Sequence, residues 1–219
     1  MRVAIAGAGK VGKAIARELI TNGHEILLID REASEIRPDS IPGAKMFQGD
    51  ACEAAALEAA GLQTCQVLVA ATGDDKVNLV VSLLAKTEYG VPRVVARVNH
   101  PKNEWMFDET WGVDVAVSTP QIVAALVEEA VTVGDLVKLF SFRKGNADLV
   151  ELTLAADSPV VGQRIDALAW PTDTALVAIL RGSRVIAPSP DDALEAGDEL
   201  LFVAAPDQEA QLSDLLRNC

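Results

Sequence analysis

The chain has 219 residues, half of them apolar, which is enough for one large or two small globular domains. A net charge of −13 argues against a general nucleic-acid binder and against binding to anionic lipid, because both need a basic surface. No apolar run approaches the roughly 20 residues of a membrane span, and a strand pattern begins at residue 2 in place of a signal peptide. We therefore expect a cytoplasmic protein that does not insert into a membrane.

Residues 2–30 predict a strand, a glycine turn, a helix, a second strand and an acid. The turn is a G-x-G-x-x-G motif made of Gly7, Ala8, Gly9, Lys10, Val11 and Gly12. In such a motif the first glycine permits the tight turn, the second lets the backbone approach a phosphate, and the third lets the helix lie close to the strand. Backbone N–H groups at the start of the helix then face the anion.

Asp30 lies at the end of the second predicted strand, 18 residues after Gly12. A carboxylate there can accept hydrogen bonds from the two hydroxyls of an adenosine ribose, which favours an unphosphorylated ribose. The alternative is a glycine turn that only packs a helix, with Asp30 as a solvated charge. Because the whole strand, turn, helix and acid pattern is present, a nucleotide or dinucleotide site is the working hypothesis.

Strand and helix patterns alternate six times before residue 120 and predict a doubly wound, Rossmann-like parallel sheet of the α/β class. After residue 30 the expected strands are 44–48, 66–71, 92–98 and 113–117, and the expected helices are 51–60, 76–88 and 102–110. Three residues of the last helix, Trp105, Met106 and Phe107, are expected to serve in packing.

Several polar residues follow these strands, at the edge where open α/β sheets bind ligands. Asp50 ends one strand, and the segment 72–78 could hydrogen-bond a ribose or a diphosphate. For Asp74 and Asp75 a helix-capping role is at least as well supported as ligand contact. Arg97 could meet a phosphate or pair with a carboxylate such as Asp74, and the sequence leaves both open.

Thr119 and Pro120 begin a helix that is apolar nearly all round. Such a helix needs cover on more than one side, so we expect it to pack against a second subunit; an interdomain helix within one chain is the alternative. From Asp135 short alternating strands predict a second, smaller α+β domain without a catalytic constellation. The predicted domains are 1–134, including a dimerising helix at about 119–132, and 135–219.

The whole chain resembles the regulatory subunits of Trk/Ktr-type potassium uptake systems, soluble proteins with an N-terminal and a C-terminal RCK domain. In the first half the resemblance rests on AGAGKVGKAIARELITNGHEILLID, FQGDA, ATGDDKVNLVVSLLAK, ARVNHP and GVDVAVSTPQIVA. In the second half it rests on SPVVGQRIDAL and AILRGSRVIAPSPDDALEAGDELLFVA.

The resemblance implies an ATP, ADP or NAD(H) ligand, with Mg²⁺ as a companion ion. The glycines would hold the phosphates, Asp30 the ribose, and Asp50 with Ala51 the adenine edge. Lys10 stands where some members carry an arginine directed at the terminal phosphates, and because lysine is the less rigid ligand this leaves discrimination between ATP and ADP open. The full predicted set of ligand-binding residues is Gly7, Ala8, Gly9, Lys10, Val11, Gly12, Asp30, Arg31, Asp50, Ala51, Thr72, Gly73, Asp74 and Arg97.

The resemblance also implies assembly and a partner. It implies a homodimer built on the helix after Pro120, and a tetramer or octameric ring that docks on the cytoplasmic face of a membrane-embedded potassium transporter. Some members bind a cyclic dinucleotide in the second domain, and the stretch 160–188, with Arg164, is compatible with this.

We therefore predict a nucleotide-binding regulatory subunit that gates potassium transport and is not an enzyme. The first alternative is a regulator of a potassium channel or a cation antiporter, which the sequence does not separate from the first reading. The second is an NAD-dependent oxidoreductase, for which the second half offers no proton donor; the only tyrosine, Tyr89, precedes a turn.

Overall fold

The computed structural model describes residues 1–131, 133–142 and 146–217 of the chain. These residues divide into two compact units, 1–120 and 121–219, which are described separately. The last position of the predicted helix 119–132 lies outside the described residues. The assignment of that helix to the N-terminal domain stays a prediction.

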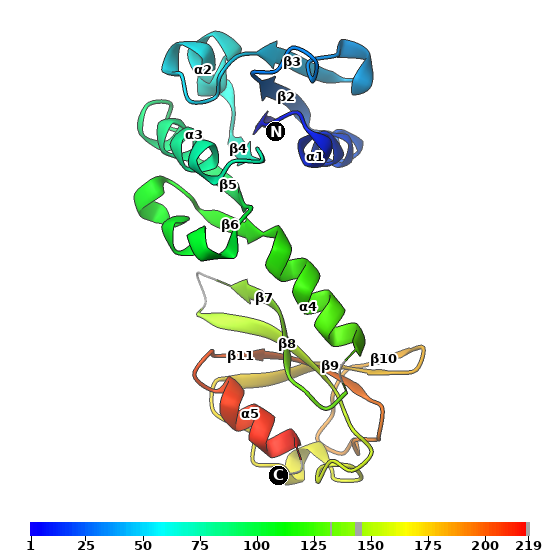
Figure 1. The fold of residues 1–219 in the computed structure, drawn as a ribbon. Helices are drawn as coiled ribbons and strands as arrows, with labels where there is room; N and C mark the ends of the chain where they lie inside the picture. Colours follow the sequence, from blue (N-terminus) through cyan, green and yellow to red (C-terminus); the bar gives the residue numbers. More distant parts are fainter. Residues whose placement is uncertain (132, 143–145, 218–219) are drawn as a thin grey trace. The chain divides into compact units, whose positions relative to one another are not determined.

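The first unit is built on a six-stranded parallel sheet with the strand order β3-β2-β1-β4-β5-β6 (Figure 1). The strands are β1 (Arg2–Ala6), β2 (Glu25–Asp30), β3 (Ala44–Gln48), β4 (Val67–Ala70), β5 (Arg93–Val98) and β6 (Val115–Ser118). All five neighbouring pairs run parallel, and the order reverses between β1 and β4. The expected Rossmann-like, doubly wound sheet is confirmed, and its reversal point is where such sheets bind ligands.

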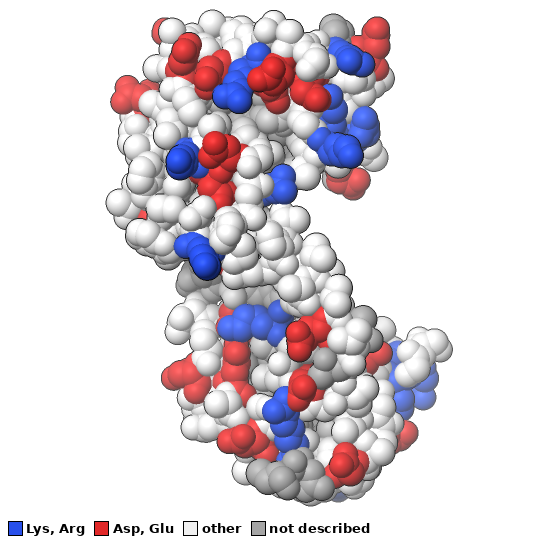
Figure 2. All heavy atoms as spheres, viewed as in Figure 1, with Lys and Arg blue, Asp and Glu red and all other residues white. Residues whose placement is uncertain are grey.

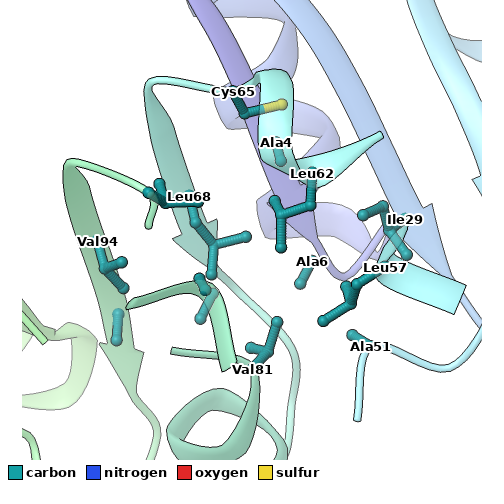
Figure 3. Packing of buried hydrophobic residues seen from close by; sticks show 14 of the residues in the cluster. Ala4, Ala6, Ile29, Ala51, Leu57, Leu62, Cys65, Leu68, Val81 and Val94 are labelled. Atoms are coloured by element: carbon teal, nitrogen blue, oxygen red, sulfur yellow. The ribbon is translucent and has the colours of Figure 1, made fainter. Parts of the chain in front are cut away.

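Helices cover both faces of this sheet. The helical elements up to β5 are α1 (Lys10–Thr21), η1 (Pro38–Ser40), α2 (Ala54–Ala60), η2 (Leu62–Thr64) and α3 (Asp75–Thr87). Ile5 and Leu28 belong to the core cluster that also contains Ala16 of α1. On the other face, Leu57 of α2 and Val81 of α3 pack with Leu68 of β4, as Figure 3 shows. Burial of these apolar side chains holds the turns between strands and helices in place.

The connection from β5 to β6 differs from the single helix expected at 102–110. It consists of two short 3₁₀ helices, η3 (Pro101–Met106) and η4 (Glu109–Trp111). Phe107 lies between them and is fully buried, so the chain must turn there to bring the ring into the core. The expectation that Phe107 serves in packing is therefore confirmed. The same expectation for Trp105 is wrong, because its side chain is 77% exposed.

The second unit is a smaller antiparallel sheet with the strand order β10-β9-β11-β8-β7. Its elements are β7 (Val137–Phe142), β8 (Ala147–Thr153), η5 (Ile165–Ala167), β9 (Thr174–Arg181), β10 (Arg184–Ile186), β11 (Glu199–Ala204) and α5 (Glu209–Leu216), and α4 (Thr119–Val131) begins two residues before this unit and continues into it. One face of the sheet carries a separate core in which Leu152 and Phe202 pack with Leu212 of α5. A second, smaller α+β domain is therefore confirmed. Among the described residues no helix is long and apolar enough to cross a membrane.

Candidate functional site

A cavity of about 460 Å³ lies at the carboxyl ends of the strands in the first unit. This size falls within the range of about 300–1,000 Å³ that is usual for small-molecule sites. It is lined by Gly7, Gly9, Lys10, Val11, Ile29, Asp30, Arg31, Glu32, Gly49, Asp50, Ala51, Ala71, Thr72, Gly73, Asp74, Val77 and Arg97. The cavity therefore joins residues from five separate stretches of the sequence.

The glycine turn between β1 and α1 is shaped by two close contacts. Gly7 has φ +105°, and a Cβ there would lie 2.9 Å from the backbone of Ala71. A Cβ on Gly12 would lie 1.8 Å from the carbonyl oxygen of Gly7. Gly9 is different, because a Cβ there would meet nothing within 4 Å. Gly7 and Gly12 are needed by the fold itself, whereas the open space at Gly9 lies on the cavity side.

The start of α1 presents backbone donors to the same cavity. Gly9 is the N-cap residue without a side-chain cap, and the first intrahelical hydrogen bond runs from Lys13 N to Gly9 O at 2.9 Å. The N–H groups of residues 10–12 therefore have no intrahelical partner. The first turn also carries no acidic residue. This arrangement suits an anion, which is attracted by the N–H groups and by the positive end of the helix dipole.

Asp30, at the end of β2, fastens the glycine turn. Its Oδ2 accepts a 2.7 Å hydrogen bond from Ala8 N, and its Oδ1 accepts a 2.9 Å bond from Glu32 N. Each carboxylate oxygen can accept more than one hydrogen bond, so the side chain can support the turn and still accept from a ligand hydroxyl. Ala8 is fully buried behind the turn, which explains why it does not line the cavity.

The loop after β3 forms a second wall. Asp50 Oδ1 accepts a 2.8 Å hydrogen bond from Cys52 N, a local turn that presents Asp50 and Ala51 to the cavity. Burial, together with the neighbouring Asp50 carboxylate, raises the pKa of the Cys52 thiol. The thiol is therefore a poor nucleophile, and nothing here indicates cysteine chemistry.

The opposite wall comes from the ends of β4 and β5. Asp74 caps α3 by accepting a 2.8 Å hydrogen bond from Lys76 N and also lines the cavity, so capping and ligand contact are compatible. Asp75 does not line the cavity. Arg97 does, and its buried Nε has no hydrogen-bond partner among the described residues. Arg97 and Asp74 form no ion pair in the described structure, so the Arg97 guanidinium remains available for an anion.

The acidic and basic side chains of the cavity differ in whether they already have partners. Its acids Asp30, Asp50 and Asp74 each accept a backbone N–H group. Within the described chain Lys10 and Arg97 enter no ion pair, while Arg31 pairs with Glu32 at 3.2 Å. On the face drawn in Figure 2, acidic and basic side chains are interspersed. Unpaired cations beside free helix amides suit a phosphorylated ligand better than a neutral one.

Of the predicted site residues, all but Ala8 and Gly12 line the cavity, and those two belong to the turn behind it. The lining residues outside the predicted set are Ile29, Glu32, Gly49, Ala71 and Val77, of which only Val77 belongs to the segment 72–78 that was expected to meet a ribose or a diphosphate. Four of these adjoin predicted residues in the chain, so the motif was a usable signal for them. Val77 lies in the first turn of α3, and its exposure to the cavity depends on the phase of that helix.

Outside this cavity the structure shows less. The described residues contain no group of three or more metal-binding side chains. In the second unit a cavity of about 230 Å³ is lined by residues 134–135, 155, 157–158 and 216–217, outside the stretch 160–188. Arg164, in that stretch, pairs with Asp166 at 2.7 Å and also with Asp191. Binding of a cyclic dinucleotide stays an untested prediction.

Comparisons with known proteins agree with both units. Residues 3–119 match the TrkA-N domain and residues 149–217 match the TrkA-C domain. The Trk system potassium uptake protein TrkA of Mycobacterium tuberculosis is 58% identical over 216 residues, which cover 99% of this chain and 98% of that protein.

Solved structures show the same fold. The GsuK channel bound to NAD aligns with the whole chain at a TM-score of 0.71 and 18% identity, and this chain covers 40% of it. The AMP-bound form of the Kef CTD of Shewanella denitrificans is 28% identical, with a TM-score of 0.52, over 59% of this chain and 79% of that one.

Proposed function

Since the chain belongs to the TrkA family of potassium uptake proteins, we propose that it is a nucleotide-binding regulatory subunit that gates a membrane potassium transporter. In this proposal an adenine nucleotide binds in the cavity of the first unit. Two nucleotides with different affinities for two conformations shift the population between them. The transporter responds to that shift.

The cavity itself is the observation that carries the proposal. Three features belong to residues that line this one cavity: the open position at Gly9, the free amides at the start of α1, and Arg97, whose Nε has no partner in the described structure. A ligand that has phosphate groups as well as a ribose would contact these residues and Asp30 together. The AMP-bound Kef structure supports an adenine nucleotide, since it is 28% identical in the part that aligns.

Each lining group then has a definable part in binding. Backbone amides of the glycine turn and α1 bind the phosphates, with Lys10 and Arg97 supplying charge. Asp30 accepts from the ribose hydroxyls, and Asp50 with Ala51 lies against the adenine. Thr72, Gly73 and Asp74 form the facing wall. A Mg²⁺ ion would bind together with the nucleotide phosphates, because Mg²⁺ usually binds through substrate phosphates and one or two carboxylates.

Assembly is the second part of the proposal. Val123, Leu126 and Val127 of α4 are each more than half exposed, as is Val131. Apolar side chains that are exposed together on one helix are typical of a subunit interface. We place the homodimer contact on α4, and a tetramer or octameric ring of such dimers on the cytoplasmic face of the transporter. The relatives' name as potassium uptake proteins supports that partner and the absence of catalysis.

The first experiment measures thermal unfolding of the full chain with ATP, ADP, AMP, NAD⁺, NADH or cyclic di-AMP, each with and without Mg²⁺. A ligand that binds only the folded state raises the midpoint by mass action. We expect ATP or ADP to raise it and Asp30→Ala to reduce that rise. If no nucleotide moves the midpoint, the cavity is structural and the proposal is wrong. A rise with NADH alone would reopen the oxidoreductase alternative.

The second experiment tests gating. The potassium transporter encoded in the same cell is reconstituted in vesicles, and rubidium uptake is recorded with and without this protein. We expect uptake to depend on the protein and to differ between ATP and ADP, while the Asp30→Ala variant should lose the difference. Binding of nucleotide without any effect on uptake would instead favour a channel or an antiporter as the partner.

A further inference from the structure

The first turn of α3 lies directly behind the cavity and is held by an unusual concentration of buried polar groups. Asn78 is fully buried, and Asp75 is 7% exposed. Neither side chain lines the cavity. A buried carboxylate and a buried amide are costly unless every polar atom is used, so their partners indicate what they do.

Asn78 connects the ends of two strands. Its Oδ1 accepts from Thr72 N at 2.9 Å and from the Thr72 hydroxyl at 2.7 Å. Its Nδ2 donates to the carbonyl oxygen of Arg97 at 2.9 Å. Thr72 lies two residues after the end of β4, Arg97 is the penultimate residue of β5, and both line the cavity. One side chain therefore fixes the spacing between the two strand ends that form this wall of the site.

Asp75 fastens the chain that follows Arg97. Its Oδ1 accepts from Asn99 N at 2.7 Å and from Asn99 Nδ2 at 3.0 Å. Its Oδ2 accepts from His100 N at 3.0 Å and from Asn103 Nδ2 at 2.8 Å. Asn99 Nδ2 also donates to the carbonyl oxygen of Thr72 at 3.0 Å. The four hydrogen bonds leave the loop after β5 with little freedom.

We propose that Asp75 and Asn78 are positioning residues of the nucleotide site, which hold the Arg97 guanidinium at the place where it meets the phosphates. This inference rests on the proposed function. Arg97 needs such support because its own Nε has no partner in the described structure. Its position is set from the backbone, through the Asn78 bond to its carbonyl and the Asp75 clamp on the loop beyond it.

The test compares ATP, ADP and adenosine binding to the full chain by titration calorimetry. A residue that positions a phosphate ligand should affect nucleotides and spare the nucleoside, whereas general loosening should affect all three alike. We expect Asp75→Asn to weaken ATP about tenfold, the size of one charge-assisted hydrogen bond, and adenosine less than about twofold. Asp108→Asn is the matched control, because the Asp108 carboxylate also accepts a backbone N–H group, that of Thr110, and Asp108 does not line the cavity.

A double-variant cycle with Arg97→Gln distinguishes positioning from an independent effect. If Asp75 acts through Arg97, the double variant should bind ATP no more weakly than Arg97→Gln alone. If Asp75→Asn does not fold, Asn103→Ala removes one of the four donors and should shift the ratio of ATP to adenosine affinity in the same direction.

Equal losses for ATP and adenosine, or additive losses in the double variant, would overturn the inference while leaving the nucleotide site intact. Failure of the unaltered protein to bind any nucleotide would overturn the proposed function, and this inference with it.

Discussion

Gly9 and Gly12 are three residues apart in one motif, yet the structure gives them different parts. A Cβ on Gly12 would lie 1.8 Å from the Gly7 oxygen, a distance that only a shift of the turn can relieve. A Cβ on Gly9 would enter open space, and the residue has φ −72°, which alanine adopts without strain. Gly12 is therefore required by the fold, whereas the missing side chain of Gly9 leaves room for a ligand in the cavity.

This difference gives the first prediction. Gly12→Ala should cost about 2 kcal/mol or more in unfolding free energy, because overpacking forces the backbone to move. Gly9→Ala should change stability by less than about 0.5 kcal/mol but weaken nucleotide binding, since its methyl group occupies the cavity side of the turn. Urea unfolding and calorimetry measure the two effects. Equal stability losses in the two variants would contradict the assignment.

Asp75 gives the second prediction, which concerns pH. Although burial alone raises the pKa, the hydrogen bonds from Asn103, Asn99 and His100 hold the pKa of the Asp75 carboxyl below its ordinary value of 3.8. A lowered folded-state pKa adds stability above the unfolded-state pKa, and this stability is lost as the pH falls through the folded-state pKa.

We therefore expect Asp75→Asn to be less stable than the unaltered protein at pH 7 by about 2 kcal/mol. The gap should narrow as the pH falls below about 4, because the unfolded chain takes up a proton at Asp75 before the folded protein does. Urea titrations at several pH values measure the gap. A gap that stays constant over this range would mean that the carboxylate charge contributes nothing.

The sequence could not tell Asp74 from Asp75. Both acids lie at the start of α3, Asp74 as its N-cap and Asp75 as its first residue, and from the sequence either could cap the helix. What separates their roles is a set of hydrogen bonds to the Asp75 carboxylate from Asn99 and Asn103, which lie 24 and 28 residues further along the chain, after β5. Trp105 was misassigned for a related reason, because the break in the helix at Phe107 directs one ring inward and leaves the other exposed.

At the scale of elements, the patterns that were long and regular gave correct predictions. The six parallel strands and α1 follow from apolar runs and the glycine motif, since local sequence determines both. The helix expected at 51–60 begins only at Ala54, because Asp50 first forms its turn with Cys52. The phase and the ends of short helices depend on such side-chain bonds, which no periodicity reveals.

The third prediction concerns α4. Leu126 is 55% exposed on an apolar face of this helix, and burial of a charge in a subunit interface is costly. Leu126→Glu should therefore weaken the proposed homodimer by about 2 kcal/mol, roughly a thirtyfold rise in its dissociation constant. Light scattering after size exclusion measures the mass over a range of concentrations.

Val185→Glu provides the matched control, because Val185 is 78% exposed in β10 and the chemical change is of the same kind. It should leave the mass unaltered. If both variants keep the mass of an unaltered dimer, the dimer does not depend on α4, and if the unaltered protein is a monomer, the proposed homodimer is wrong.

At the scale of the whole molecule, each unit has a core of its own. Ile5, Leu28 and Leu68 belong to the clusters of the first unit, and Leu152 and Phe202 belong to the cluster of the second. The proposed ligand contacts lie entirely within the first unit. Units with separate cores can unfold as separate cooperative transitions, in which case a single midpoint does not describe the chain.

The last prediction follows from that separation. Differential scanning calorimetry should resolve two transitions, and ATP at about 100 times its dissociation constant should stabilise only the first unit, by about 2.7 kcal/mol. For a unit of this size the rise in midpoint is about 10 °C. Trp170, which packs against the core of the second unit, reports that transition by fluorescence in a variant in which Trp105 and Trp111 of the first unit are replaced by phenylalanine. Asp30→Ala should abolish most of the rise without moving the Trp170 signal. If ATP raises both transitions together, the units are coupled in unfolding, and a nucleotide in the first unit would then be able to act on the second.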